Sequence, residues 1–136
     1  MELADTSVWA RKEKPAVREW FQAALEAAEI AVCDVVALEI LHSARDGSEF
    51  RPVEDALEAI PWISIQPSDW HRAREVYRVL ADRGGGHQRS VTHPDLLIAA
   101  AAEREGVSLV HYDSDYDTIA EVTGQSVRWV APRGTL

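Results

Sequence analysis

The sequence has very little cysteine. Cys33 is the single cysteine, so the chain cannot form an internal disulfide bond or build a cysteine-based zinc site. The sequence also has no apolar run near the roughly 20 residues that cross a bilayer, and its first residues lack the basic and apolar regions of a signal peptide. We therefore expect a soluble, cytoplasmic protein in which Cys33 is a small core residue.

Basic charge is also scarce. The 136 residues include 14 lysines and arginines against 23 aspartates and glutamates, which gives a formal net charge of −9. Such a chain repels phosphates, so a broad nucleic-acid-binding surface is not expected unless metal ions neutralise some of the acids. With 46% hydrophobic residues, the length fits one compact domain that spans residues 1–136.

Several motifs of known chemistry are missing. The five histidines form no His-x-x-x-His pair, which disfavours a zinc enzyme. An EF-hand loop that starts at Asp113 needs glycine and glutamate where this chain has Thr118 and Gly124, so calcium storage is excluded. The run Gly84–Gly86 lacks the lysine and hydroxyl residue of a phosphate-binding loop and predicts a mobile turn or hinge. The chain also has no Gly-x-Ser-x-Gly elbow for serine chemistry.

Short apolar segments alternate with helical patterns along the chain. The predicted strands are Leu3–Ala4, Ile30–Cys33, Trp62–Ile65, Leu109–Val110 and Val127–Val130. The predicted helices are Lys14–Ala28, Asp34 to about Ala44, Pro52–Ala59, Ser68–Ala81, Pro94–Arg104 and about Asp117–Thr123. Asp34 is expected to cap its helix, residues 46–48 to break the chain, and Gly106 to end a helix. This alternation favours a parallel sheet covered by helices on both faces.

Three aspartates are predicted to meet at one edge of this sheet. Asp5 ends the first strand, and Asp113 follows a later one, so both lie at carboxyl ends of strands. A helix from Asp95 to Arg104 runs about 15 Å, and the following strand returns about 13 Å, so Asp95 should lie level with Asp113. We therefore expect a common acidic rim.

Glu39 is a fourth candidate for this rim. It lies in "DVVALEIL", where the residues three and four positions earlier are Val36 and Val35, so its face of the helix is predicted to be largely apolar. A carboxylate in apolar surroundings needs a partner. The motif has no basic residue three or four positions away, so a surface salt bridge does not explain Glu39.

Structural roles explain some of these acids equally well. Asp95 fits a capping box with Thr92, and Asp5 fits the cap of a following helix. The run Asp113–Asp117 fits a solvated loop that begins a helix, and this is the favoured role of Asp117. Converging bare carboxylates would repel one another by several kcal/mol, however. Oxygen ligands of this kind select Mg²⁺ or Mn²⁺.

Four motifs in this order resemble one family. They are "LADTSVW" near the start, "DVVALEIL" around Glu39, "THPDLLIAAAA" around Asp95 and "LVHYDSDYDTIA" around Asp113. Together they resemble the PIN-domain ribonucleases, and most closely the VapC toxins of bacterial toxin–antitoxin pairs. The resemblance covers nearly the whole chain.

The resemblance implies a three-layer α/β/α fold with a central, mostly parallel five-stranded sheet. It also implies an endoribonuclease that uses Mg²⁺ or Mn²⁺ to activate water and leaves 5′-phosphate and 3′-hydroxyl ends. By position, the catalytic acids would be Asp5, Glu39, Asp95 and Asp113. The metal ligands would be Asp5, Asp95 and Asp113, with Asp115 as an auxiliary ligand and Thr6 as a hydroxyl lining the site. Asp113 is preferred over Asp115 as the fourth acid because it follows the strand more directly.

Partners follow from the same resemblance. Toxins of this type form homodimers, and a small VapB-type antitoxin covers the active-site groove of each with its C-terminal segment. An arginine of such an antitoxin could pair with the acidic rim. No membrane partner is expected.

A cluster of arginines has two interpretations. The segment "WHRAREVYRVLADRGGGHQR" predicts either a phosphate-binding stripe or an amphipathic helix with solvated arginines. In the first case the RNA contacts would be Arg72, Arg78, Arg83 and Arg89.

Two other functions stay open at this point. The chain could be a catalytically inactive module of the same fold that only binds an antitoxin. It could also be a haloacid-dehalogenase-like phosphatase, whose motif is an Asp-x-Asp pair. That motif requires threonine or valine where this chain has Asp117, and it usually lies near the amino terminus.

Overall fold

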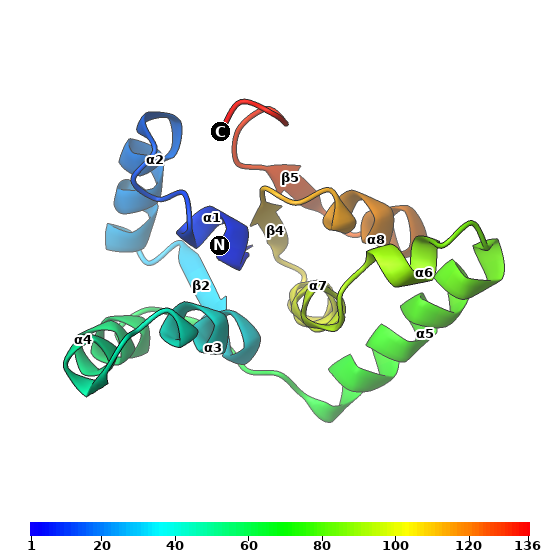
Figure 1. Ribbon diagram of the computed structural model, residues 1–136, viewed down its shortest axis with the longest axis horizontal. Helices are drawn as coiled ribbons and strands as arrows, with labels where there is room; N and C mark the ends of the chain where they lie inside the picture. The colour runs from blue at the N-terminus through cyan, green and yellow to red at the C-terminus, as the bar shows by residue number, and fades with distance from the viewer.

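Five parallel strands form one central sheet in the order β3-β2-β1-β4-β5 (Figure 1). The structure is a computed structural model that describes residues 1–136, apart from the side chain of His87. The strands are β1 (Glu2–Ala4), β2 (Ile30–Cys33), β3 (Trp62–Ile63), β4 (Ser108–His111) and β5 (Val127–Trp129). The helices are α1 (Thr6–Trp9), α2 (Pro15–Glu26), α3 (Asp34–His42), α4 (Gly47–Glu58), α5 (Pro67–Arg83), α6 (His87–Ser90), α7 (His93–Glu105) and α8 (Asp115–Thr123).

Helices cover both faces of the sheet. Leu3 and Leu109 belong to a larger apolar cluster with residues of α3, α5, α7 and α8. Their neighbours Ala4 and Val110 belong to a smaller cluster with residues of α1 and α2. Because successive side chains of a strand point to opposite faces, the two clusters lie on opposite sides of the sheet. In Figure 1 the strands lie between α2 and the pair α5 and α7. The predicted three-layer α/β/α fold is therefore confirmed.

Most of the predicted elements are present. The strand Ile30–Cys33 has the predicted bounds and is fully buried, Cys33 included. Gly106 ends α7 with a φ of 65°, a left-handed conformation that glycine adopts without strain. Gly84–Gly86 forms the predicted turn between α5 and α6, with positive φ at each residue. None of the helices within the described residues is long and apolar enough to cross a membrane.

Other boundaries differ from the prediction for local reasons. Helix α4 begins at Gly47 and contains Pro52, because the Asp46 carboxylate accepts the backbone N–H groups of Ser48 and Glu49 and caps the helix at the predicted break. The predicted cap by Asp34 is wrong. Cys33 occupies the cap position, and Oδ2 of Asp34 accepts the N–H of Ile65 at 2.6 Å, which ties the end of β3 to α3.

The two short helices were not predicted, since four residues are too few to show a helical period. Helix α1 follows β1 directly, and α6 follows the glycine turn. Helix α8 begins at Asp115, two residues before the predicted start at Asp117. These short segments matter because α1 and α8 flank the acidic edge of the sheet.

A buried ion pair fixes α7 along the sheet. Asp69 is 1% exposed, and Arg104 donates to its two carboxylate oxygens at 3.0 and 3.1 Å. Arg104 also donates to the Ser64 carbonyl at 2.8 Å, and the Gln66 N–H donates to Asp69 at 2.8 Å. The network joins the end of β3, the start of α5 and the last turn of α7. It therefore helps set the position of Asp95 at the other end of α7.

We predict that Arg104→Ala lowers the free energy of unfolding by about 3 kcal/mol, because it leaves the buried Asp69 carboxylate without its cation. Urea denaturation followed by circular dichroism measures this loss. The control is Arg72→Ala, which breaks pairs with the more exposed Glu75 and Glu103 and should cost less than about 1 kcal/mol. Equal losses in the two variants would contradict a stabilising role for the buried pair.

Candidate active site

The acidic rim lies where the chain reverses its direction across the sheet. From β1 the chain moves to β2 and β3 on one side, and then returns to β4 and β5 on the other side of β1. Ligands of parallel sheets gather at the carboxyl ends of strands at such a point. Asp5 follows β1, and its N–H donates to the carbonyl of Val110 in the neighbouring β4 at 3.0 Å. Asp113 lies two residues beyond the end of β4.

Three carboxylates come close together at this edge. Asp95, Asp113 and Asp115 each offer an oxygen, and these oxygens lie within 4.8 Å of one another. Oδ1 of Asp113 accepts the N–H of Asp115 at 2.9 Å, so the two residues form one tight turn at the start of α8. Both Asp113 and Asp115 therefore belong to the cluster.

Asp95 has a role in the helix and in the cluster. The side chain of Thr92 caps α7 by accepting the backbone N–H of Asp95 at 3.4 Å. The backbone of Asp95 thus makes the cap, while its carboxylate is free to face Asp115. Thr92 therefore makes its half of the predicted capping box, whereas the Asp95 carboxylate belongs to the cluster.

Asp5 joins the cluster through a buried tyrosine. Oδ2 of Asp5 accepts the Ser7 N–H at 2.9 Å and caps α1, whereas Oδ1 accepts the hydroxyl of Tyr116 at 2.6 Å. The same hydroxyl lies 3.1 Å from Oδ1 of Asp95. A phenol has one hydrogen, so the shorter contact assigns most of it to Asp5. Tyr116 is 0% exposed and Asp5 4%, so this link between the acids is closed to water.

Glu39 lies at the exposed edge of the site, close to Asp5. Its Oε1 accepts the Thr6 hydroxyl at 2.9 Å, which places both predicted residues together. The prediction of an apolar surrounding is wrong, because Glu39 and its neighbour Leu38 are exposed. The pKa of Glu39 is nevertheless raised, mainly because its carboxylate loses hydration and also because Asp5 is near, while the Thr6 hydrogen bond opposes the shift.

Burial and like charge raise the pKa values of two acids in the cluster. Loss of hydration, together with the charges of Asp5 and Asp113, raises the pKa of Asp95 to about 7. Loss of hydration also raises the pKa of Asp115, which Asp95 opposes by hydrogen bonding. We take the shared proton to reside on Asp95 and to be donated to Asp115. Without a cation, the cluster therefore holds a proton near neutral pH.

Two buried residues of the site were missed by the sequence analysis. Besides Tyr116, His111 is 0% exposed, and its Nδ1 accepts the N–H of Asp113 at 3.1 Å. Burial lowers the pKa of His111 and favours the neutral ring, with its hydrogen on Nε2. That nitrogen has no hydrogen-bond partner within the described part of the chain. The signal in the sequence was the position of both residues next to the aspartate run, where a buried tyrosine or histidine needs a polar partner.

The donor set fits a hard divalent cation. All ligand atoms of the cluster are carboxylate oxygens, and Nδ1 of the neighbouring His111 is already occupied because it accepts the Asp113 N–H. The proton held by Asp95 marks the point where positive charge is needed. Asp117 is not part of this set, because its carboxylate accepts the indole N–H of Trp129 at 3.0 Å. Asp117 lies in the first turn of α8, near the helix start that the sequence favoured for it, but its carboxylate binds Trp129 and is not simply solvated.

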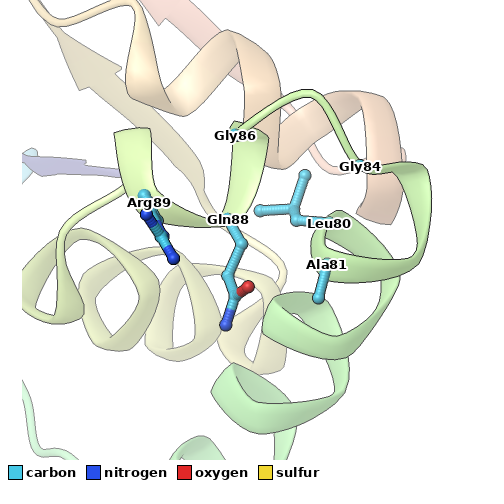
Figure 2. A pocket seen from close by; sticks show the side chains of 6 residues that line it. All are labelled: Leu80, Ala81, Gly84, Gly86, Gln88 and Arg89. Atoms are coloured by element: carbon cyan, nitrogen blue, oxygen red, sulfur yellow. The ribbon is translucent and has the colours of Figure 1, made fainter.

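The predicted RNA-binding arginines are not equivalent. Arg72 forms ion pairs with Glu103 and Glu75, and Arg83 lies 3.6 Å from Glu121, so their charges are compensated. Arg78 makes no ion pair with any described residue. Arg89 lines a pocket between α5, the glycine turn and α6, together with Gln88 and Leu80 (Figure 2). No acid of the cluster belongs to the lining described for this pocket.

Comparisons with known proteins agree with this architecture. Residues 3–122 match the model of the PIN domain family. Ribonuclease VapC18 of Mycobacterium tuberculosis is 44% identical over 132 residues, which cover 97% of this chain and 96% of that protein. Ribonuclease VapC51 of the same organism is 42% identical over 134 residues, which cover 98% and 96%.

A solved structure supports the fold. A chain of a toxin–antitoxin complex from Klebsiella pneumoniae superposes with a TM-score of 0.70 at 18% identity, covering 96% of this chain and 98% of that one. The parallel sheet with an acidic cluster at its switch point defines a PIN domain. The chain belongs to the PIN-domain family, within its VapC group.

We predict that metal binding at the cluster releases a proton near neutral pH. Because the pKa of Asp95 is about 7 and a metal ion binds the charged carboxylate, Mn²⁺ affinity should rise about tenfold per pH unit below about pH 6 and level off above about pH 8. Calorimetry in two buffers of different ionisation enthalpy counts the released protons. A flat affinity across this range would contradict the assignment.

The raised pKa of Asp95 also affects the stability of the metal-free protein. This stability should fall as pH rises, whereas the affinity for metal should increase. The folded state raises the pKa of Asp95 from 3.8 to about 7, so the stabilisation linked to its proton is fully present below the lower value and is lost as pH rises through the higher one. The metal-free protein should therefore melt at a lower temperature at about pH 8 than at about pH 5.5. Asp95→Asn should remove most of this difference.

We predict that Tyr116→Phe weakens Mn²⁺ binding roughly tenfold, because Asp5 and Asp95 lose the hydroxyl that orients them. The variant keeps the ring and should lose about 1–2 kcal/mol of stability. Tyr77→Phe is the matched control, since it removes a hydroxyl that lies 3.4 Å from His93 on the surface, and it should change neither quantity. Unaltered Mn²⁺ affinity in Tyr116→Phe would exclude this role of the hydroxyl.

Proposed function

We propose that this protein is a Mg²⁺- or Mn²⁺-dependent endoribonuclease and the toxin of a VapBC-type toxin–antitoxin pair. The observation that carries the proposal is the convergence of Asp95, Asp113 and Asp115 within 4.8 Å at the switch point of a PIN-domain sheet. Relatives at 44% and 42% identity are named ribonucleases. Membership of the PIN family also removes the basis for the alternative of a dehalogenase-like phosphatase.

Different residues of the chain would have different roles in hydrolysis. Asp95, Asp113 and Asp115 would hold the cation, and Tyr116 would keep Asp5 oriented toward them. A divalent ion at this place supplies a Lewis acid that lowers the pKa of water and offsets charge on the phosphodiester. Glu39, whose pKa is raised and whose carboxylate is fixed by Thr6, is suited to accept a proton at the mouth of the site.

Partner binding is part of the proposal. The similar chain from Klebsiella pneumoniae comes from a toxin–antitoxin complex. In this chain Leu38, beside Glu39 on α3, is 70% exposed, and Trp70 on α5 is 59% exposed. Exposed apolar side chains that gather in one patch mark surfaces that contact another protein, and each of these two residues could contribute to such a patch. We propose that they contact a VapB-type antitoxin and a second copy of the chain.

We predict that the purified protein cleaves RNA only with Mg²⁺ or Mn²⁺, and that Asp95→Asn lowers the rate roughly 100-fold or more, because it removes a charged ligand of the cation. The asparagine keeps the backbone N–H that Thr92 caps. A gel assay with single-stranded RNA, with and without a chelator, measures both effects.

Asp117→Asn is the control for this experiment. It changes an acid of the same "DSDYD" segment, but the asparagine oxygen can still accept the Trp129 indole N–H. Its rate should stay within about threefold of the wild type, because Asp117 lies outside the metal-binding set. If the wild type binds Mn²⁺ but cleaves no RNA under any condition, the protein is the inactive binding module instead.

A further inference from the structure

Seven of the twelve arginines in this protein are held in place in one of two ways. Arg45, Arg72, Arg83, Arg104 and Arg128 each form an ion pair with a carboxylate. Arg128 also lies over the ring of Trp20, but it donates to both oxygens of Glu2 at 2.6 and 2.7 Å. Arginines of this group have their charge compensated and their N–H donors occupied, so they are poorly suited to bind a further anion.

Arg11 and Arg133 are held by aromatic rings instead. The guanidinium carbon of Arg11 lies 4.4 Å from the centre of the Tyr112 ring, and that of Arg133 lies 5.7 Å from the centre of the Trp129 ring. Neither arginine forms an ion pair with any described residue. The attraction of a ring for a cation keeps the positive charge uncompensated and leaves the edge of the guanidinium free to donate.

The two aromatic rings join these arginines into one surface. Tyr112 and Trp129 pack edge to face with ring centres 5.3 Å apart, so Arg11, Tyr112, Trp129 and Arg133 form a continuous row, here called the arginine–aromatic ladder. Tyr112 and Trp129 are half-buried and Arg133 is exposed. Lys12 and Lys14 follow Arg11 and are exposed as well. This is a group of cations in a chain whose formal net charge is −9.

The ladder lies directly beside the acid cluster. Tyr112 precedes Asp113 in the chain, and its N–H donates to the hydroxyl of Ser7 at 2.8 Å. The N–H of the same Ser7 donates to the Asp5 carboxylate, and Arg11 donates to the Ser7 carbonyl at 2.9 Å. The Arg11 end of the ladder is therefore anchored to the turn that carries Asp5, while Tyr112 is anchored to the turn that carries Asp113.

We propose that the arginine–aromatic ladder binds the phosphates of single-stranded RNA next to the cleavage site. The inference rests on the proposed nuclease function and names the surface through which its substrate binds. Single strands are bound by positive grooves that combine cations with aromatic side chains, and phosphates accept N–H donors of arginine at well-defined angles. The acid cluster by itself repels phosphates, so cations beside it are required to offset that repulsion.

The test measures the salt dependence of RNA binding. A fluorescent single-stranded RNA of mixed sequence and about 10 nucleotides is titrated, with a chelator present, with the Asp95→Asn protein, whose cleavage should be roughly 100-fold slower or more. Each phosphate contact contributes about 0.7 to the slope of log K against log salt concentration. We expect Arg133→Gln and Arg11→Gln each to lower this slope by about 0.7, and the double variant by about 1.4.

Arg78→Gln is the matched control. Arg78 is an exposed arginine of α5 without an ion pair to any described residue, and it represents the alternative stripe predicted from the sequence. Its replacement should leave the slope unchanged. Arg133 makes no hydrogen bond with any described residue, so the result for Arg133→Gln does not depend on a change in folding. An unchanged slope for Arg133→Gln, or an equal decrease for Arg78→Gln, would overturn the proposal.

Steady-state cleavage by the protein with an intact Asp95 separates this inference from the proposed function. Arg133→Gln should raise KM several-fold and leave kcat nearly unchanged, because the ladder contacts RNA away from the reacting phosphate. Cleavage with an unaltered KM in this variant would refute the ladder and leave the nuclease intact. Absence of both RNA binding and cleavage in the parent protein would instead refute the nuclease function itself.

Discussion

Repulsion between carboxylates is the constraint on which the rest of this structure depends. Asp95, Asp113 and Asp115 present oxygens within 4.8 Å of one another, and Asp5 is linked to them by one tyrosine hydroxyl. Like charges at such distances in a partly dehydrated site repel by several kcal/mol. Loss of hydration, and after it this repulsion, raises the pKa of Asp95 to about 7, so the carboxyl group retains its proton to a higher pH than a free aspartate. A protein selected only for stability would gain by replacing one of these acids.

The surrounding structure tolerates the repulsion by giving Asp5 and Asp113 hydrogen-bond donors of their own. Asp5 accepts the Ser7 N–H and the Tyr116 hydroxyl, and Asp113 accepts the Asp115 N–H. These donors come from elements adjacent to the acids, namely α1 and α8, and not from a neutralising lysine or arginine. The arrangement orients the carboxylates without compensating their charge, which would preserve their affinity for the divalent ion of the proposed function. Arg104 does the opposite for Asp69, whose buried charge serves only the fold.

The position of the acids could be predicted from the sequence, but their detailed surroundings could not. Asp5 and Asp113 follow short apolar strands, and strand ends of a parallel sheet share one edge, so their proximity follows from topology. Tyr116 escaped prediction because its direction depends on how α8 packs, and that packing involves residues distant in sequence. The compensation of Arg72 by Glu103 escaped for the same reason, since 31 positions separate the two residues. For Glu39, the helix pattern indicated burial, whereas the end of the sheet leaves its side chain at the surface.

For the proposed nuclease, the distribution of cations would resolve the apparent conflict between an acidic protein and an anionic substrate. The formal net charge of −9 describes the whole surface, but a phosphate near the site is affected mainly by charges within about 10 Å at moderate salt. Within that distance, what matters is which arginines are already paired. Ion pairs compensate the arginines that brace α5 and α7, whereas Arg11 and Arg133 lie against aromatic rings and retain their charge. For the proposed nuclease, local pairing, and not net charge, would therefore decide where RNA approaches the carboxylates.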